Sequence, residues 1–216
     1  MTAKKLMGKK VGMVQLFDEK GHVVPCSVIK VDANVISQVK TQEKDGYKAI
    51  QLAAFKKEKQ RGSKPLKGHF SKADLPFFEQ LMEVRVDGLS DYKMGQELSL
   101  ELFAEEKYLD IVGVSKGKGY QGLMKKYNFS GGPAKHGSKF HRHAGSTGMR
   151  STPGRCLPGG KRPSRMGGEQ KSIQSLKVVK VDLDEGLVIV KGAIPGCVGS
   201  KVVIQTAVKK VKAVRG

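Results

Sequence analysis

The chain has 216 residues, of which 38% are hydrophobic, enough for one medium domain or one domain with an appendage. Lysine and arginine number 40 against 20 acids, and the net charge of +20 favours a polyanionic partner, either nucleic acid or an anionic membrane. No apolar run approaches the roughly 20 residues of a membrane span, and a strand-like segment close to Met1 leaves no room for a leader peptide, so we expect a cytoplasmic protein. The three cysteines form no CxxC pair, so we expect neither a zinc site nor a disulfide framework.

Short runs rich in β-branched and aromatic residues fill the first half of the chain and are separated by turn residues. Such spacing is typical of a β-meander or β-barrel. A turn is predicted at Asp18-Glu19-Lys20-Gly21, and Ser71–Phe78 is expected to form one short helix. The predicted strands of this half are Lys9–Phe17, His22–Val31, Asn34–Lys40, Tyr47–Phe55, Gln80–Val86, Glu97–Phe103 and Tyr108–Val114.

The segment Ile111–Gly168 contains no aspartate or glutamate. Its 58 residues hold 12 lysines and arginines, three histidines, 14 glycines and four prolines, so it carries +12 of the net charge of +20. From Ser130 onward it has neither a helical nor a strand period, and alone in water it would bury too little surface to offset its chain entropy. It is either a flexible basic linker or a long loop that becomes ordered on RNA. The second interpretation is favoured because a compact domain rarely carries so long a loop without a task.

Strand patterns return after this segment. Ser175–Asp182 and Gly186–Val190 predict a hairpin, Lys201–Val208 a last strand, and Lys209–Gly216 a basic tail. These strands resemble the earlier ones in character, so the simplest architecture is one β-barrel body built from both ends of the chain. Closing a barrel also removes exposed strand edges.

Three glycines, Gly117, Gly119 and Gly122, spell GxGxxG directly after a predicted strand. A dinucleotide site would need an acid about 20 residues later within a βαβ unit. No acid occurs before Glu169 and no second parallel strand follows. We therefore expect no nucleotide cofactor, and interpret the glycines as positions where the backbone approaches RNA phosphates.

Three histidines, His136, His141 and His143, form a second cluster. A metal site is disfavoured because acids are absent, Cys156 is the only thiol of the segment, and the neighbours are cationic. The imidazoles are better suited to stack on bases or to bond phosphates and 2′-hydroxyls. No GxSxG elbow or carboxylate pair supports hydrolysis, so we expect neither an enzyme nor a small-molecule substrate.

Several long motifs resemble bacterial members of the ribosomal protein L3 family, in the right order and over nearly the whole chain. They are MGKKVGMVQLFDEKGHVVPCSVIKV, SKGKGYQGLMKKYNF, HGSKFHRHAGSTGMRSTPGR, RMGGE and VVKVDLDEGLVIVKGAIPG. The resemblance implies a mainly β fold: a closed β-barrel of the translation-factor type with an inserted α+β subregion and a long irregular basic extension. Residues 1–112 and 170–216 would form the barrel body, with the inserted subregion at 56–95, and residues 113–169 the extension.

The resemblance also implies a structural constituent of the large ribosomal subunit. Such a protein binds the large, 23S-type rRNA directly near its 3′ end, nucleates subunit assembly, and braces the peptidyl-transferase region with its long loop. Its neighbours would be proteins L14 and L19. A free RNA-binding chaperone with a basic tail that stays mobile is the alternative, and sedimentation with ribosomes separates the two.

Carried onto this sequence, the resemblance places the tip of the extension near Pro163–Gly167. Many bacterial members have a methylated glutamine where this chain has Arg165, so we expect no methylation and a fixed positive charge against the RNA. The expected rRNA-binding residues are Lys116, Lys118, Lys125, Lys126, His136, His141, Arg142, His143, Arg150, Arg155, Lys161, Arg162 and Arg165.

Overall fold

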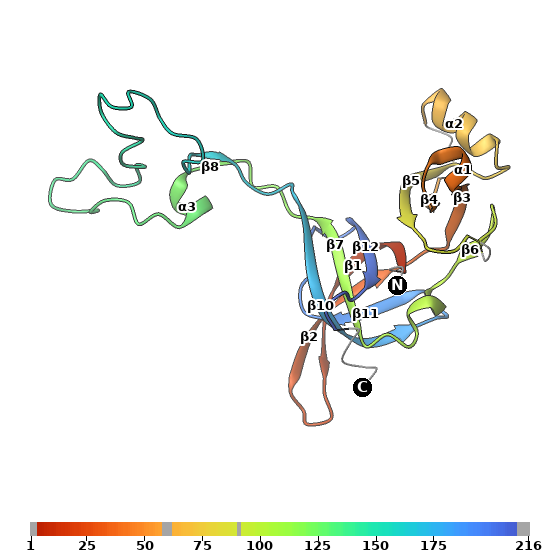
Figure 1. The fold of residues 1–216 in the computed structure, drawn as a ribbon. Coiled ribbons are helices and arrows are strands. Elements are labelled where there is room, and N and C mark those ends of the chain that lie inside the picture. The colour runs from red at the N-terminus through yellow and green to blue at the C-terminus, as the bar shows by residue number, and fades with distance from the viewer. Residues whose placement is uncertain (1–3, 58–61, 90–91, 211–216) are drawn as a thin grey trace. The chain divides into compact units, whose positions relative to one another are not determined.

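A computed structural model describes residues 4–57, 62–89 and 92–210, and its fold is mainly β, as predicted (Figure 1). The chain divides into two compact units. We call Met1–Val114 with Gln170–Gly216 the body, and Ser115–Glu169 the extension. Most of the predicted basic tail, residues 211–216, lies outside the described residues. No described helix combines the length and apolar composition that a membrane crossing requires.

Six antiparallel strands of the body pair in a closed barrel. In order around the barrel they are β1 (Lys5–Phe17), β12 (Lys201–Thr206), β7 (Tyr108–Val114), β10 (Gln170–Asp182), β11 (Leu187–Lys191) and β2 (Val23–Lys30). The turn between β1 and β2 falls where it was predicted, because the Asp18 carboxylate accepts bonds from the amides of Lys20 and His22. Strand β10 begins five residues before its predicted start at Ser175. Ser175 takes a φ of +57°, which lies outside the strand region, so the alternation of side chains between the two faces is broken there.

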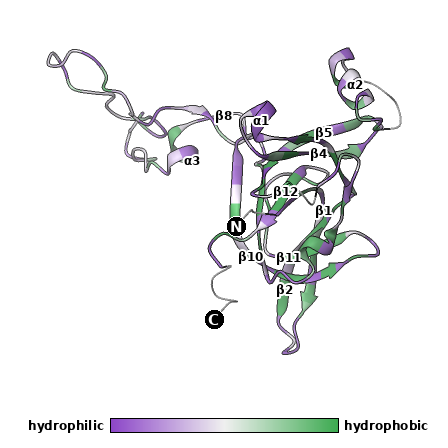
Figure 2. Cartoon of the chain, turned by 45° about the vertical axis from the view of Figure 1, so that its right-hand side comes forward, coloured by the Kyte–Doolittle hydropathy of each residue, from purple (hydrophilic) through white to green (hydrophobic). Residues whose placement is uncertain are grey.

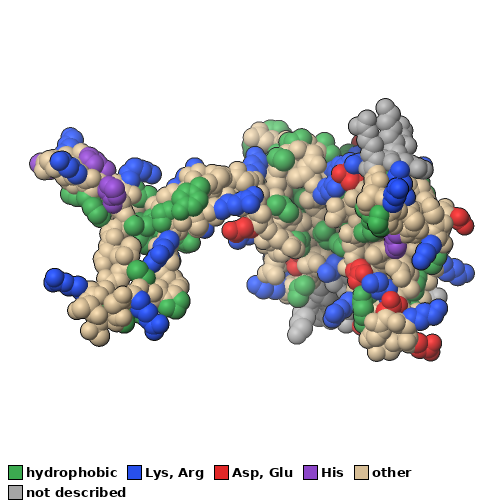
Figure 3. All heavy atoms as spheres, turned by 90° about the horizontal axis from the view of Figure 1, so that it is seen from above, with side chains coloured by type: hydrophobic (Ala, Val, Ile, Leu, Met, Phe, Trp, Pro, Cys, Tyr) green, Lys and Arg blue, Asp and Glu red, His purple; other side chains and the backbone are tan. Residues whose placement is uncertain are grey.

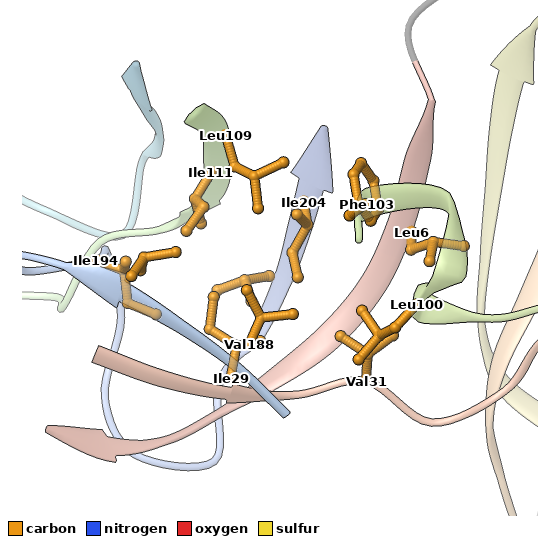
Figure 4. Packing of buried hydrophobic residues seen from close by; sticks show 12 residues of the cluster. Leu6, Ile29, Val31, Leu100, Phe103, Leu109, Ile111, Val188, Ile194 and Ile204 are labelled. Carbon is orange, nitrogen blue, oxygen red and sulfur yellow. The ribbon is translucent and has the colours of Figure 1, made fainter. Parts of the chain in front are cut away.

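The barrel interior holds the main core, which Figure 4 shows from close by. Residues alternate along each strand, so Leu6 of β1 and Ile204 of β12 point inward, while Met7 and Val203 belong to a cluster outside the barrel. The predicted strand Glu97–Phe103 divides into β6 (Glu97–Leu98) and the 3-10 helix η1 (Leu100–Phe103). Leu100 and Phe103 lie three residues apart and both pack into the barrel core, which the helical turn permits and a strand does not.

A second sheet of the body has the order β5 (Phe78–Arg85), β4 (Ala49–Lys56), β3 (Asn34–Lys40) and β6. The segments Asn34–Lys40 and Tyr47–Phe55 were predicted as barrel strands, and the structure corrects this. Every barrel strand already has two partners, so β3 has no open edge to join and pairs with β4 and β6 instead. Strands β3 and β4, expected in the barrel, thus belong to a sheet outside it.

Both faces of the second sheet carry buried apolar residues, which pack in two separate clusters. Figure 2 colours the ribbon by hydropathy, and hydrophobic residues recur along the strands of the body. One face carries Ile36 and Leu52 and packs with Met7 and Val203 of the barrel, and the other carries Val35 and Ala53 and packs with Phe70 of α2 (Lys64–Ser71). A shorter helix, α1 (Gln42–Asp45), joins β3 to β4. Successive side chains of a strand point to opposite faces of the sheet, so neighbouring residues contact different clusters.

The predicted helix Ser71–Phe78 is wrong, because the helix ends at Ser71. Pro65 is suited to the first turn of a helix, and Ser63 precedes it at the N-cap position. After the helix, Asp74 takes a φ of +49° and Pro76 follows, which favours an irregular chain over a further turn.

Candidate nucleic-acid interface

The extension begins and ends in a short two-stranded ribbon. Strand β8 (Tyr120–Gln121) pairs antiparallel with β9 (Ser164–Arg165). Backbone bonds continue the pairing: the amide of Lys118 donates to the carbonyl of Met166 at 2.9 Å, and the amide of Met166 donates to Gly119 at 2.9 Å. The chain therefore enters and leaves the extension along adjacent segments.

This ribbon corrects the expected position of the tip. Pro163–Gly167 was expected at the far end of the extension, but its backbone pairs with residues 118–121, near the start of the extension. Gly167 takes a φ of +73°, and a Cβ there would collide with the carbonyl oxygen of Lys116. Only glycine permits this approach, and the pairing partners lie over 40 residues apart, so no local pattern in the sequence indicates the ribbon.

Helix α3 (Leu123–Tyr127) follows β8 and brings three predicted contact residues together. The Lys126 ammonium donates to the Ser164 hydroxyl and, at 2.9 Å, to the Arg165 carbonyl, so it ties α3 to β9. The ammonium groups of Lys126 and Lys161 lie 5.2 and 5.6 Å from the centroid of the Tyr127 ring. Lys126, Lys161 and Arg165 thus form one cationic group around the ribbon.

A loop beyond α3 contains the three histidines. The amide of Gly132 donates to the carbonyl of His141 at 3.2 Å, and the rings of Phe140 and His143 lie 5.4 Å apart at 36°. His136 takes a φ of +57° at the turn of this loop. Among the described residues no group of three or more histidine, cysteine or acidic side chains is arranged to hold a metal ion.

The predicted contact residues are exposed, apart from Lys126, which is half-buried. Every residue from 139 to 163 is exposed, including Arg142, Arg150 and Arg155, and Lys125 is exposed on α3. Gly148 lies against Arg155 and Cys156, so Arg150 and Arg155 belong to one folded-back loop. Figure 3 shows cationic and histidine side chains along the extension. An array of exposed cations is the arrangement that neutralises phosphates.

Acid partners for these cations are scarce within the extension, which has twelve lysines and arginines and a single acid, Glu169. The body is different: Glu83 pairs with Lys40 at 2.5 Å, and Glu79 pairs with Lys201 at 3.0 Å. Positive charge in the extension is therefore available to an external polyanion.

Sequence reasoning missed the exposed apolar side chains of the extension. Tyr120 is 75% exposed, Met149 70%, and Phe140 is also exposed. The signal was present: apolar residues scattered without helical or strand period have no core to enter, and here they fall within the acid-free segment. In an RNA-binding segment such side chains are suited to contact bases.

Comparison with known proteins supports the same conclusion as the motifs. Residues 82–189 match the family described as "Ribosomal protein L3". The chain is similar to the large ribosomal subunit protein uL3 of Chlamydia felis (strain Fe/C-56), with 52% identity over 208 residues that cover 93% of this chain and 94% of the relative. The uL3 proteins of Protochlamydia amoebophila (strain UWE25) and Chlamydia trachomatis serovar D are 50% and 53% identical over 214 and 208 residues, covering 96% and 93% of this chain and 91% and 94% of theirs. The chain belongs to the ribosomal protein L3 family.

Proposed function

We propose that this protein is a structural constituent of the large ribosomal subunit that binds rRNA through its extension. The family is one of ribosomal structural proteins, and the chain is not an enzyme. One observation carries the proposal. The extension, all of whose residues are described, has twelve lysines and arginines against one acid, and Leu123 is its one fully buried side chain. Such a unit obtains little folding free energy from burying its own side chains, and much more free energy is available from its contacts with phosphates.

The finer proposal follows from the resemblance to L3. The protein binds the large, 23S-type rRNA near its 3′ end, nucleates subunit assembly beside proteins L14 and L19, and braces the peptidyl-transferase region with residues 113–169. The exposed cations and histidines named above contact phosphates and sugars, which position a protein on RNA without reading its sequence. The function needs no metal, cofactor or small-molecule substrate.

Replacing Arg142, Arg150 and Arg155 together with alanine tests the proposal. Loss of three phosphate contacts is expected to lower the yield of complete large subunits in a sucrose gradient by tenfold or more. A control variant removes three exposed lysines of the body, Lys44, Lys72 and Lys93, and should assemble normally. Normal assembly of the arginine variant would count against the proposal.

Stoichiometry separates this function from that of a free RNA chaperone. A structural constituent is retained at one copy per large subunit in moderate salt, whereas a chaperone dissociates and gives no fixed ratio. Quantifying the protein in salt-washed subunits by mass spectrometry distinguishes the two.

The same preparation tests the expectation at Arg165. Because arginine replaces the glutamine that many bacterial members methylate, the intact mass of the protein from purified subunits should show no methyl group on this side chain. A methylated side chain at position 165 would contradict the prediction.

A further inference from the structure

The ring of Tyr120 is held in place yet open to solvent. At 75% it is the most exposed of the large apolar side chains in the described part of the chain. Its hydroxyl donates to the carbonyl of Pro163 at 2.9 Å, across the ribbon. This bond restricts the orientation of the ring without covering its faces, so the entropy cost of fixing the side chain is already met before any partner arrives.

Arg165 lies directly opposite Tyr120 in the β8–β9 pairing. Directly opposite residues of an antiparallel pair place their side chains on the same face, with Cβ atoms about 5 Å apart. The Arg165 guanidinium lies over Gly168, where a Cβ would come within 3.5 Å of Nη2. An aromatic ring and a guanidinium therefore share one face of the ribbon.

Other bonds stabilise the ribbon behind this face. A two-stranded ribbon of this length is marginal by itself. Lys126 donates to the Ser164 hydroxyl and the Arg165 carbonyl from α3, and the Gln121 side-chain amide donates to the carbonyl of Lys118. The backbones of Tyr120 and Arg165 are thus fixed relative to one another by groups that leave the ring free.

We propose that Tyr120 and Arg165 form a site for an unpaired RNA nucleobase, which stacks on the Tyr120 ring while its phosphate pairs with the Arg165 guanidinium. The inference rests on the proposed function and names the part of the RNA that this face binds. A ring stacks on any base, and a guanidinium matches phosphate through two parallel hydrogen bonds. Bases within a duplex are already stacked, so the site selects a loop, bulge or single strand.

The test uses the full-length protein and a single-stranded oligoribonucleotide of about 12 nucleotides with a central 2-aminopurine, alone or annealed to its complement. Stacking on Tyr120 should quench the fluorescence of the single strand and not that of the duplex. Tyr120→Leu removes the ring and should weaken single-strand binding about tenfold and abolish the quenching. Tyr120→Phe keeps the ring but loses the bond to Pro163 that orients it, so it should retain the quenching and bind only a few-fold more weakly.

Salt dependence separates the two partners of the site. Arg165→Gln should lower the slope of log affinity against log salt by about 0.7, the value of one phosphate contact on a single strand. Tyr120→Leu should leave the slope unchanged, because stacking releases no counterion. Tyr120→Trp guards against a general disturbance of the ribbon, since it restores a ring and should recover affinity and quenching.

Two results of the oligoribonucleotide experiment overturn the inference: wild-type protein that binds the single strand without quenching, or Tyr120→Leu with wild-type affinity and quenching. Chemical probing of large subunits separates this failure from failure of the proposed function. Wild-type protein absent from the subunits would defeat the proposed function. Normal incorporation of Tyr120→Leu with every rRNA base still protected would defeat only the nucleobase site.

Discussion

Asn34 is fully buried where the barrel meets the second sheet. Its side-chain oxygen accepts the amide of Met7 at 2.9 Å, and its amide donates to the carbonyls of Met7 and Asp32. Asn34 therefore hydrogen-bonds the backbone of β1 at the start of β3, where the chain passes from the barrel to the second sheet. A buried polar group that loses its partner costs about 1–3 kcal/mol.

Replacing Asn34 with leucine keeps the branched shape of the side chain but leaves the amide and carbonyl of Met7 without these partners. We expect the free energy of unfolding, measured by urea titration, to fall by about 2–4 kcal/mol. Ser37→Ala is the control, because that buried hydroxyl bonds only within the second sheet, to Gln51, and its loss should cost about 1 kcal/mol. An Asn34→Leu variant as stable as the control would contradict this role.

Glu79 links the second sheet to the barrel through a side-chain hydrogen bond with Lys201, which lowers the pKa of Glu79 below its ordinary value of 4.5. A depressed carboxyl pKa gives stability that is present above about pH 4.5 and is lost as the pH falls through the folded-state pKa. Glu79→Gln should therefore cost up to about 1 kcal/mol at pH 7.

The difference in unfolding free energy between Glu79→Gln and wild type should disappear under acid conditions, well below the ordinary pKa. Urea titrations at neutral and acid pH measure it, with Glu43→Gln, an exposed position of α1, as the control. A difference that is the same at both values would show that hydrogen bonding of the neutral side chain, and not the charge, stabilises the junction.

At the scale of elements, the loop after α3 depends on close backbone contact. Gly131 takes a φ of +74°, and a Cβ there would lie 2.5 Å from the carbonyl oxygen of His141. Gly131→Ala should open this loop, because strain from the positive φ, about 1–2 kcal/mol, adds to the steric clash. Limited proteolysis of the extension should become several-fold faster. Gly137→Ala, with a φ of +72° and open space, carries the strain alone and should change the rate less.

Elements whose contacts are local were predictable from the sequence. The β1–β2 and β10–β11 hairpins follow from alternation around polar turns. The division of strands between barrel and second sheet was not predictable, because Asn34–Lys40 alternates as the barrel strands do. In the site, exposed cations followed from charge and the absence of a core, but the Tyr120–Arg165 pairing did not, since glycine-rich segments over 40 residues apart give no periodic signal.

At the scale of the whole molecule, the two units can be separated by design. Val114 of β7 lies directly opposite Gln170 of β10, so an Asn-Gly turn can join them in place of the extension. The shortened protein should retain the melting temperature of the body within a few degrees, because the barrel core contains only body residues. Its affinity for rRNA should fall by about a thousandfold, with a much smaller salt slope.

Calorimetry and filter binding measure these two properties. Joining the same residues with a glycine-serine linker as long as the extension provides the control, and it should bind rRNA as weakly as the short variant. Wild-type affinity in either variant would assign rRNA binding to the body.

The closed barrel also determines when the molecule can fold during its own synthesis. Strand β12 lies between β1 and β7, so until it is made both of those strands have an open edge. The basic segment 115–169 leaves the polypeptide exit tunnel before β12 does, so it is exposed to solvent and to any polyanion while the barrel is still incomplete. A nascent chain that ends before β12 therefore carries the full cationic segment on an incomplete barrel, in which β1 and β7 each have an unpaired edge.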